Sequence, residues 1–570
     1  MSHSSSRRDF VIKLATLSAV GTSGLTLSAC GGGDDDAPPA FNHGVASGDP
    51  LADRVILWTH ARYPDRSDAV ALTWEVATDN AFTQIVRQGQ AQASAGTDFT
   101  VKVDATGLSA NREYFYRFRQ GRHLSPIGRT RTLPTGNVSE VKLAVFSCAN
   151  YPAGFFNVYA EAARSDAQFA VHLGDYIYEY GATNADGSPA YASANAAALG
   201  RVSQPTQELT LLSHYRQRHA QYKSDPDSKD LHARMPMIAV WDDHEIANDS
   251  YKDGADNHDP VTEGSFATRK QAALQAYHEW MPIRTGTDPS IIYRSFNFGQ
   301  LLSLHMLDTR LIGRDKQVSF GELLNPATAA TAQATMASPA RQLLGNTQLG
   351  WLQGQMQAST ATWQVLGQQV LMGNMAFPVS VLSTLEGGDV SAAQTAVTAY
   401  LTAKATPANL RTPEQVGLMS QTKLGYNLDA WDGYPAARET LLMMAYGLNK
   451  QLITLAGDTH NAWFSDLRLA GYANSALAGT QVGVEFATAS VSSPGLEDYL
   501  SAIPPAQVKY IFENVVDDLN WMDPSRRGFL KMTFTPTTVT GDWVFISTIS
   551  ARGNYTILET VQRSYPAASV

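Results

Sequence analysis

Four separate apolar, strand-like runs of this sequence end abruptly in side chains that can bind metal ions. The runs cover 142–146, 169–173, 237–240 and 452–456, and they lead into Cys148, Asp175, Asp243 with His244, and Asp458 with His460. A buried strand that stops at a polar cluster places that cluster in a loop at a sheet edge, where residues distant in sequence can meet. One such cluster can simply cap a helix, but four together predict a mixed α/β fold with a cleft at its strand ends.

The remaining patterns predict the organisation of the chain. Residues 41–135 contain short alternating runs, and 108–114 resembles the tyrosine corner of an immunoglobulin-like sandwich, which predicts an N-terminal all-β domain. After a linker at 134–137, a catalytic domain is expected over 138–560, with helices at 266–280 and 435–448. Residues 182–207 and 382–408, rich in Ala, Ser and Thr, are interpreted as insertions. Residues 529–535 and 543–550 predict a hairpin with its turn at 539–542.

The first 30 residues are typical of a targeting signal. Ser6-Arg7-Arg8-Asp9-Phe10 matches a twin-arginine export signal, and the apolar run at 14–27 is too short and too rich in small residues to span a membrane comfortably. Leu27-Ser28-Ala29-Cys30 fits a lipoprotein cleavage site, so we expect a lipid on Cys30 and a flexible tether at 31–40. A short membrane anchor, or cleavage without lipid, are the alternatives. The prediction is export by the twin-arginine machinery to the periplasm or cell surface, with the membrane contacted only through the lipid.

Composition narrows the functional class. The length of 570 residues exceeds one ordinary domain, and the net charge of −10 argues against nucleic-acid binding as the main role. Phosphorylated substrates remain possible because metal ions supply a local positive field. Of the two cysteines, only Cys148 remains if Cys30 carries lipid, so no intramolecular disulfide is expected. Cys148 is then either a small buried hydrophobe or a metal ligand, and its place at a strand end favours the ligand.

The candidate ligands suit the hydrolysis of phosphate esters. Two adjacent cations can lower the pKa of an attacking water and neutralise charge on the phosphoryl oxygens, and a carboxylate between them holds their spacing. Carboxylate, imidazole, phenolate and thiolate donors together suit a transition metal such as ferric iron. Carboxylate and amide oxygens suit calcium or magnesium.

Several of these motifs resemble a known family. Gly174-Asp175 with Tyr178 is similar to an element of the purple-acid-phosphatase-like metallophosphoesterases, as are Asp242-Asp243-His244-Glu245 and Gly457-Asp458-Thr459-His460. Together with Phe146-Ser147-Cys148 and Trp431-Asp432-Gly433-Tyr434, they make the chain similar to the PhoD-type alkaline phosphatase family over about residues 41–550. The resemblance implies an α/β (α+β) fold, with a layered β-sandwich metallophosphoesterase core behind an immunoglobulin-like domain. It also implies hydrolysis of phosphate mono- and diesters by a metal-bound hydroxide, with an alkaline optimum.

The resemblance also implies residue roles. Asp175 would bridge two metals, and Cys148, Tyr178 and His460 would bind Fe3+ with it. Asp243 and Asp458 would bind Ca2+, and a further Ca2+ is expected. His244 would touch the substrate, either bonding the phosphoryl group or protonating the leaving oxygen, so that Asp175 and His244 carry catalysis; a purely structural imidazole is the alternative.

Other assignments depend on weaker signals. Asn150 and Asn248 are candidate substrate contacts, although asparagine after a strand is also common turn chemistry. Asp242 is either a further metal ligand or a residue that orients His244. Gln368 is a candidate calcium ligand in a run that also reads as a buried strand. The candidates for a phosphate-binding arginine, which the sequence does not rank, are Arg164, Arg310 and Arg438.

The predicted function is that of a metal-dependent alkaline phosphatase or phosphodiesterase acting on phosphate esters. One alternative is a phospholipase D-like diesterase that acts on lipid or on a cell-wall polymer. Another is a non-catalytic surface lipoprotein whose sandwich domain binds partners and whose metals are structural. The sequence leaves open the natural substrate, the oligomeric state, the membrane that holds the anchor, and the role of the two insertions.

Overall fold

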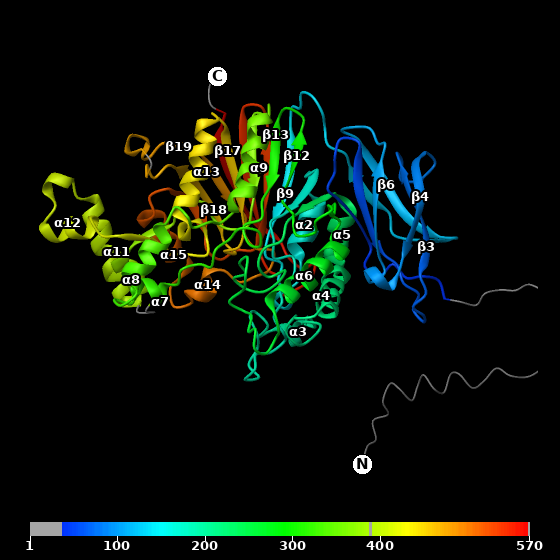
Figure 1. Cartoon of the computed structure of the whole chain (residues 1–570), viewed down its shortest axis with the longest axis horizontal. Helices are drawn as coiled ribbons and strands as arrows, with labels where there is room; N and C mark the ends of the chain where they lie inside the picture. Colours follow the sequence, from blue (N-terminus) through cyan, green and yellow to red (C-terminus); the bar gives the residue numbers. More distant parts are fainter. Residues whose placement is uncertain (1–36, 387–389, 473, 568–570) are drawn as a thin grey trace, which may run out of the picture. The chain divides into compact units, whose positions relative to one another are not determined.

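Two mixed β-sheets face each other in the computed structural model, which describes residues 37–386, 390–472 and 474–567 (Figure 1). Buried side chains from both sheets, such as Val145, Ile453 and Phe486, pack in one apolar cluster between them. The nine-stranded sheet has the order β23-β22-β21-β9-β10-β11-β1-β2-β5, and the other has the order β12-β13-β14-β17-β19-β18-β20. The first sheet comprises β1 (Val45–Gly48), β2 (Arg54–His60), β5 (Thr100–Thr106), β9 (Val141–Phe146), β10 (Phe169–His172), β11 (Met237–Ala239), β21 (Gly528–Phe534), β22 (Thr538–Ile546) and β23 (Ile557–Pro566). The second comprises β12 (Arg294–Phe298), β13 (Leu302–Met306), β14 (Trp363–Gly367), β17 (Gln451–Ala456), β18 (Ala462–Arg468), β19 (Gln481–Ala487) and β20 (Leu519–Asp523).

Helices cover the outer faces of both sheets. Beside the nine-stranded sheet pack α2 (Asn157–Arg164), α4 (Leu212–Ser224), α5 (Pro226–Arg234) and α6 (Phe266–Trp280), and beside the other pack α9 (Gly345–Ala358) and α13 (Pro435–Gly447). The two predicted helices are therefore confirmed. The Ser265 side chain accepts a hydrogen bond from Thr268 N at the start of α6, and Pro435 begins α13. The remaining helices are α3 (Ala196–Leu199), α7 (Phe320–Leu324), α8 (Ala329–Ala337), α10 (Val379–Glu386), α11 (Val390–Ala405), α12 (Pro413–Met419), α14 (Leu496–Tyr499) and α15 (Pro505–Val515).

The N-terminal region consists of strands, as predicted, but one of its sheets continues into the catalytic core. A separate sheet contains β3 (Val70–Ala77), β4 (Ile85–Ala93), β6 (Glu113–Gln120), β7 (His123–Leu124) and β8 (Gly128–Arg131). The other strands, β1, β2 and β5, extend the nine-stranded sheet because β1 pairs with β11 through Gly48 and Met237. A side chain at Gly48 would lie 2.2 Å from the carbonyl oxygen of Pro282, so glycine permits this junction. Residues 39–570 accordingly form one compact unit.

The parallel strands of the two sheets bring their carboxyl ends together. Strands β9, β10 and β11 are parallel neighbours, and so are β13, β14, β17 and β19. The sheets are joined at this edge, where Ser147 and Ser490 form a parallel bridge and Val491 N donates to Ser147 O at 3.0 Å. Loops from both sheets therefore meet at one place, as the four strand ends predicted.

Two local predictions need correction. The C-terminal hairpin turns between β21 and β22 at 535–537, not at 539–542, and Gly541 lies inside β22. A side chain at Gly541 would lie 2.6 Å from the ring of Phe486, so this glycine serves close packing between the sheets and not a turn. The chain also continues to a further edge strand, β23, which extends past the predicted domain end at 560.

The two predicted insertions differ from each other. Residues 182–207 are largely irregular and contain only α3. In contrast, residues 382–408 fall mostly in α10 and α11, which lie in the chain between the two paired strands β15 (Ala376–Pro378) and β16 (Lys423–Gly425). The predicted signal peptide with Cys30, and the tether up to residue 36, lie outside the described residues. Within the described part of the chain, no helix combines the length and apolar character needed to cross a membrane.

Candidate metal centre

Four of the predicted metal ligands have an unusual backbone conformation. Cys148, Asp175, Asp458 and His460 have φ angles of 59°, 54°, 65° and 65°, in the left-handed region that residues other than glycine rarely adopt. Each such residue costs on the order of 1–3 kcal/mol and persists only where the surrounding structure enforces it, which is most common at functional sites. Gly174 is required next to them, because a side chain there would lie 2.3 Å from Cβ of Asp242.

The first candidate ligand group combines residues that follow β9, β10 and β17. Ligand atoms of Cys148, Asp175 and His460 lie within 4.8 Å of one another. The Tyr178 hydroxyl lies 3.0 Å from Asp175 Oδ2 and 3.2 Å from His460 Nε2, so it faces the same point. His460 Nδ1 lies 2.5 Å from the carbonyl oxygen of Pro494 and donates to it, which leaves Nε2 as the ligand atom.

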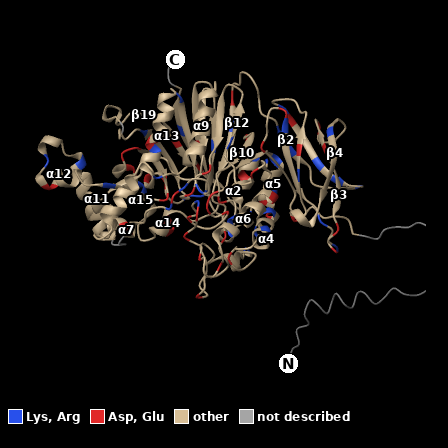
Figure 2. Cartoon of the chain, in the orientation of Figure 1, with Lys and Arg blue, Asp and Glu red and all other residues tan. Residues whose placement is uncertain are grey.

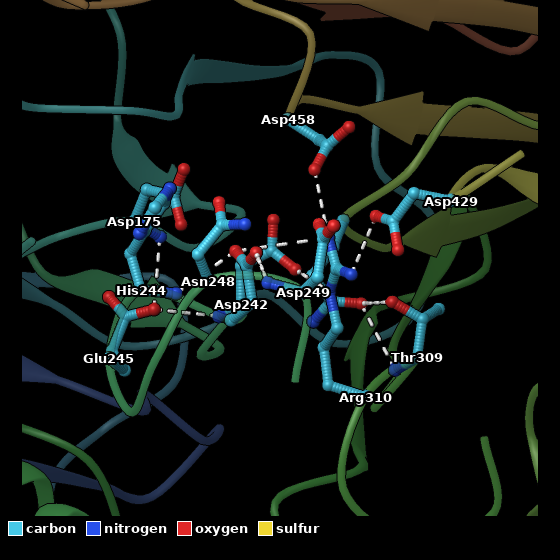
Figure 3. Close-up of polar contacts among 12 residues, drawn as sticks. Asp175, Asp242, His244, Glu245, Asn248, Asp249, Thr309, Arg310, Asp429 and Asp458 are labelled. Atoms are coloured by element: carbon cyan, nitrogen blue, oxygen red, sulfur yellow. Dashed lines mark hydrogen bonds and ion pairs between the residues drawn. The ribbon is translucent and has the colours of Figure 1, made fainter. Parts of the chain in front are cut away.

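Two further groups share residues with the first. Asp175, Asp243 and His244 form one, and Asp242, Asp243 and Asp458 form the other, each with ligand atoms within 4.8 Å of one another. Asp175, Asp242, His244 and Asp458 of these groups are labelled in Figure 3. Asp175 thus belongs to two neighbouring groups, and its Oδ1 atom is buried with no hydrogen-bond partner among the described residues. A carboxylate shared in this way has the placement of a bridging ligand.

The charges of these groups are not balanced by the protein. Burial raises the pKa values of Asp175 and Asp458 well above their usual range, and neighbouring carboxylates raise them further. Burial also raises the pKa of Asp249 to about 7, and burial together with Asp175 raises the pKa of the Cys148 thiol. In Figure 2, several loops near the centre of the catalytic region are coloured red at Asp and Glu residues. Because cations would stabilise the ionised carboxylates and thiolate, the donor set fits bound metal ions.

His244 lies at the edge of a cavity of about 420 Å³ over these groups. Its Nδ1 atom is 2.7 Å from Glu179 Oε2, and Glu179 Oε1 accepts from Asn248 N and Asn257 Nδ2, both at 2.7 Å. Burial alone would lower the pKa of His244, but the carboxylates of Asp243, Glu179 and Asp175 raise it well above its ordinary value. Glu179 thus holds the Nδ1 side of the His244 ring, and Nε2 is left available for a substrate.

Comparison with known proteins agrees with this geometry. The sequence matches the PhoD-like phosphatase family over residues 143–543, and the N-terminal domain of PhoD-like phosphatases over residues 27–134. The chain belongs to the PhoD-like phosphatase family. It is 35% identical to alkaline phosphatase D of Bacillus subtilis (strain 168) over 513 residues, which cover 86% of this chain and 76% of that protein. A solved structure described as PhoD aligns with a TM-score of 0.73 and 29% identity, over 94% of this chain and 92% of that one.

Family membership makes the protein a phosphoric ester hydrolase, and the candidate groups make it a metal-dependent one. In this PhoD-like phosphatase, no arginine lines the cavity within the described ranges. Arg310 is instead fully buried and pairs with Asp242 Oδ1 at 2.5 Å, Asp429 Oδ2 at 2.6 Å and Asp458 Oδ1 at 2.8 Å (Figure 3). The other two candidates point elsewhere: Arg438 Nε donates to Met372 O, and Arg164 Nη1 donates to Tyr555 Oη.

Two sequence-based assignments do not match the contacts in this PhoD-like phosphatase, and for Asp242 the contacts favour one of the two alternatives. Gln368 does not join the ligand groups, because its Oε1 atom accepts from Trp431 Nε1 at 3.0 Å and its amide nitrogen donates to Val370 O. Asn150 is buried and does not line the cavity, whereas Asn248 does. Asp242 is close enough to Asp243 and Asp458 to be a ligand, but Glu179 orients His244 in its place.

The structure also adds residues that the sequence-based list lacked. Glu245 accepts hydrogen bonds from the backbone N–H groups of Asp175, Tyr176 and Asp242, and so joins the loops after β10 and β11. Tyr191, from the insertion at 182–207, lines the cavity beside His460. Glu245 stands in a motif that carries the family resemblance, and Glu179 directly follows Tyr178 of another, but their roles depend on contacts that sequence spacing does not show.

Proposed function

We propose that this PhoD-like phosphatase hydrolyses phosphate mono- and diesters with Fe3+ held by Cys148, Asp175, Tyr178 and His460, and Ca2+ held by Asp175, Asp243 and Asp458. The observation that carries the proposal is the shared position of Asp175. It belongs to two adjoining ligand groups, and one of its oxygens is buried with no hydrogen-bond partner in the described part of the chain. When bound, the cations would neutralise charge on the phosphoryl oxygens and lower the pKa of an attacking water. We expect a second Ca2+ as well, and Asp242, which forms a candidate group with Asp243 and Asp458, is proposed as one of its ligands.

Side chains that line the cavity would supply proton transfer and substrate contacts. His244, held at Nδ1 by Glu179, presents Nε2 toward the cavity and is placed to protonate the leaving oxygen. Since no arginine among the described residues lines the cavity, positive charge near the phosphoryl group must come from the cations and from His244. We propose Asn248 as a substrate contact in place of Asn150, because Asn248 lines the cavity.

The experiment is an assay of the full chain on 4-nitrophenyl phosphate and bis(4-nitrophenyl) phosphate, combined with elemental analysis. We expect iron and calcium in the purified protein, hydrolysis of both esters, and loss of activity after chelation that is restored by the two ions together. Asp65→Asn removes an exposed carboxylate outside the cavity and is the matched control for Asp175→Asn, which removes the charge of the shared ligand. Full activity in metal-free protein would overturn the proposal.

We further propose that residues 1–30 direct twin-arginine export and that Cys30 carries the lipid anchor, which fits an enzyme that folds around metals before export. Cys30→Ser should release the protein from the membrane fraction without changing its activity; retention on the membrane would contradict the anchor. For the N-terminal strands we propose an immunoglobulin-like sandwich, supported by the Tyr114 hydroxyl, which accepts a hydrogen bond from Ser109 N at 2.9 Å as in a tyrosine corner.

A further inference from the structure

The cavity over the metal centre has an apolar side that the proposed chemistry does not use. Besides the carboxylates and His244, the cavity is lined by Phe377, Leu382, Leu385, Leu496, Leu500 and Phe512. None of these side chains can bind a metal ion or donate a hydrogen bond to a phosphoryl oxygen. Water and inorganic phosphate therefore gain nothing from this surface, which points to another part of the substrate.

The apolar side is built by elements from two separate parts of the chain. Phe377 lies in β15, and Leu382 and Leu385 belong to α10, at the start of the helical insertion. Leu496 begins α14, Leu500 follows it, and Phe512 belongs to α15. The rings of Phe377 and Phe512 meet edge to face with centroids 4.8 Å apart, which joins the two parts into one wall.

The wall is continuous with the charged floor of the same cavity. Tyr426, which follows β16 at the other root of the insertion, also lines the cavity and packs on Phe512 with ring centroids 5.2 Å apart. The next residues lead directly to the acidic cluster: Asn427 Nδ2 lies 3.4 Å from Asp458 Oδ2, and Asp429 pairs with Arg310. The segment from β15 to Asp429 thus contributes to the apolar wall at its start, in β15 and α10, and reaches the acidic cluster just after β16.

We propose that the apolar wall is a subsite for an aliphatic substituent on the phosphate, so that the enzyme favours diesters in which one alcohol is an unbranched alkyl chain. The inference rests on the proposed function. Leucines supply most of the wall, and a sugar or polyol bound there would leave its hydroxyl groups without partners, which costs about 1–3 kcal/mol for each buried group. Hydrolysis adds water to phosphorus and breaks the other ester bond, whose oxygen leaves with a proton.

The test is a series of 4-nitrophenyl alkyl phosphodiesters with methyl, butyl and octyl groups, assayed with the metal-loaded full chain below the micelle-forming concentration. Each methylene that becomes fully buried raises affinity about fourfold, and each methylene that is only partly buried in an open cleft raises it about twofold. We therefore expect kcat/KM to rise roughly a hundredfold from methyl to octyl. A triethylene glycol ester of octyl-like length should show no such gain. A flat series, or an equal gain from the glycol chain, would overturn the subsite.

Variants locate the effect. Leu385→Asn and Leu500→Asn replace half-buried leucines of the two parts of the wall by polar side chains of similar shape. Each should lower the octyl-to-methyl ratio of kcat/KM about tenfold, the loss of three to four methylene contributions at twofold each. Leu410→Asn is the matched control, because Leu410 lies after the same insertion helices, is 67% exposed and does not line the cavity. An unchanged ratio in both wall variants would contradict the assignment.

A binding measurement separates this inference from the proposed function. If the metal-loaded protein hydrolyses none of the esters, the proposed function fails, but calorimetry with methylphosphonate and octylphosphonate still tests the subsite. Tighter binding of octylphosphonate, reduced by Leu385→Asn and not by Leu410→Asn, would support the apolar wall alone. Equal affinity for the two phosphonates would reject it regardless of activity.

Discussion

Two buried groups of charges, one in the N-terminal strands and one at the metal centre, are balanced in opposite ways. In β3, the Glu75 side chain is 3% exposed overall and meets two arginines, Arg117 Nε at 2.8 Å and Arg119 Nε at 2.6 Å. At the centre, a single guanidinium, that of Arg310, lies within ion-pair distance of four carboxylates: Asp242, Asp243, Asp429 and Asp458. The first group has positive charge in excess, and the second lacks it.

The pKa values show what the difference means. Burial would raise the pKa of Glu75, but hydrogen bonds from Arg119 and Arg117 bring it below its ordinary value. At the centre, burial raises the pKa of Asp242 to about 7, although Arg310 opposes the shift. The N-terminal group is therefore complete within the chain, whereas the centre is complete only with added cations. A buried cluster whose own chain does not balance its charge is a stronger sign of a ligand site than buried charge alone.

The sharpest test of this contrast is Asp175→Asn. We expect kcat/KM for 4-nitrophenyl phosphate to fall by about 10³-fold or more, because the shared ligand between two groups is lost. At the same time, thermal unfolding of the metal-free variant should occur no earlier than that of the metal-free wild type, since one of several repelling carboxylates is gone. A variant that kept a tenth of wild-type activity would show that Asp175 is not the bridge.

Cation removal should have the next largest effect. Ions at about a thousand times their Kd stabilise the folded chain by about 4 kcal/mol, so chelation should lower the unfolding temperature markedly. Chelation should lower the unfolding free energy of the Glu75→Gln variant by the same amount as that of the wild type. The two charge groups share no partners, and the stability effects of distant sites add. Differential scanning calorimetry with and without chelator measures both. If chelation left wild-type stability unchanged, the unbalanced charge would have some other explanation.

This contrast also explains what the sequence could and could not predict. The strand ends at Cys148, Asp175, Asp243 and Asp458 were visible because a parallel strand places its next residues at one sheet edge whatever the loop does. The sequence does not predict the ion-pair partners of those residues. Arg310 follows β13, and its carboxylate partners Asp242 and Asp458 lie 68 and 148 residues away in the sequence. Nothing local distinguishes a guanidinium that binds phosphate from one that pairs with aspartates.

Long-range pairing hid the other features. The sharing of one sheet by the N-terminal strands depends on a single contact of Gly48 with Met237, far away in sequence. The sequence around Gly541 predicts a turn, but this position needs glycine because the ring of Phe486 on the facing sheet lies against it. A motif match predicts Gln368 as a metal ligand, but its side chain bonds Trp431, 63 residues later in the chain. In each case the deciding contact joins elements that are far apart in the sequence, so the local sequence pattern does not predict it.

A smaller effect on activity is expected from Glu179→Gln. The variant keeps the shape of the side chain but removes the charge that holds His244 and favours its protonated form. We expect kcat to fall about 10–100-fold with KM nearly unchanged, as for other residues that orient a group in direct contact with the reaction. Glu161→Gln, on α2 beside Arg164, is the matched control and should retain wild-type kinetics. A rise in KM with constant kcat would place Glu179 in substrate binding and not in the orientation of His244.

The smallest effect should come from the balanced group. Glu75→Gln is expected to destabilise the protein by about 1 kcal/mol without changing activity, because its arginine partners are partly open to water. The contribution of Glu75 to the unfolding free energy should depend on pH, and the direction of its pKa shift fixes the sign of that dependence. Since the pKa of Glu75 is lower in the folded state, its contribution is fully present above its ordinary value of 4.5 and is lost as pH falls through the folded value. The difference in unfolding free energy between wild type and variant, followed by urea denaturation, should therefore shrink as the medium is acidified below that value. A difference that grew in acid would mean that Glu75 is held in its neutral form and that the N-terminal group is no better balanced than the metal centre.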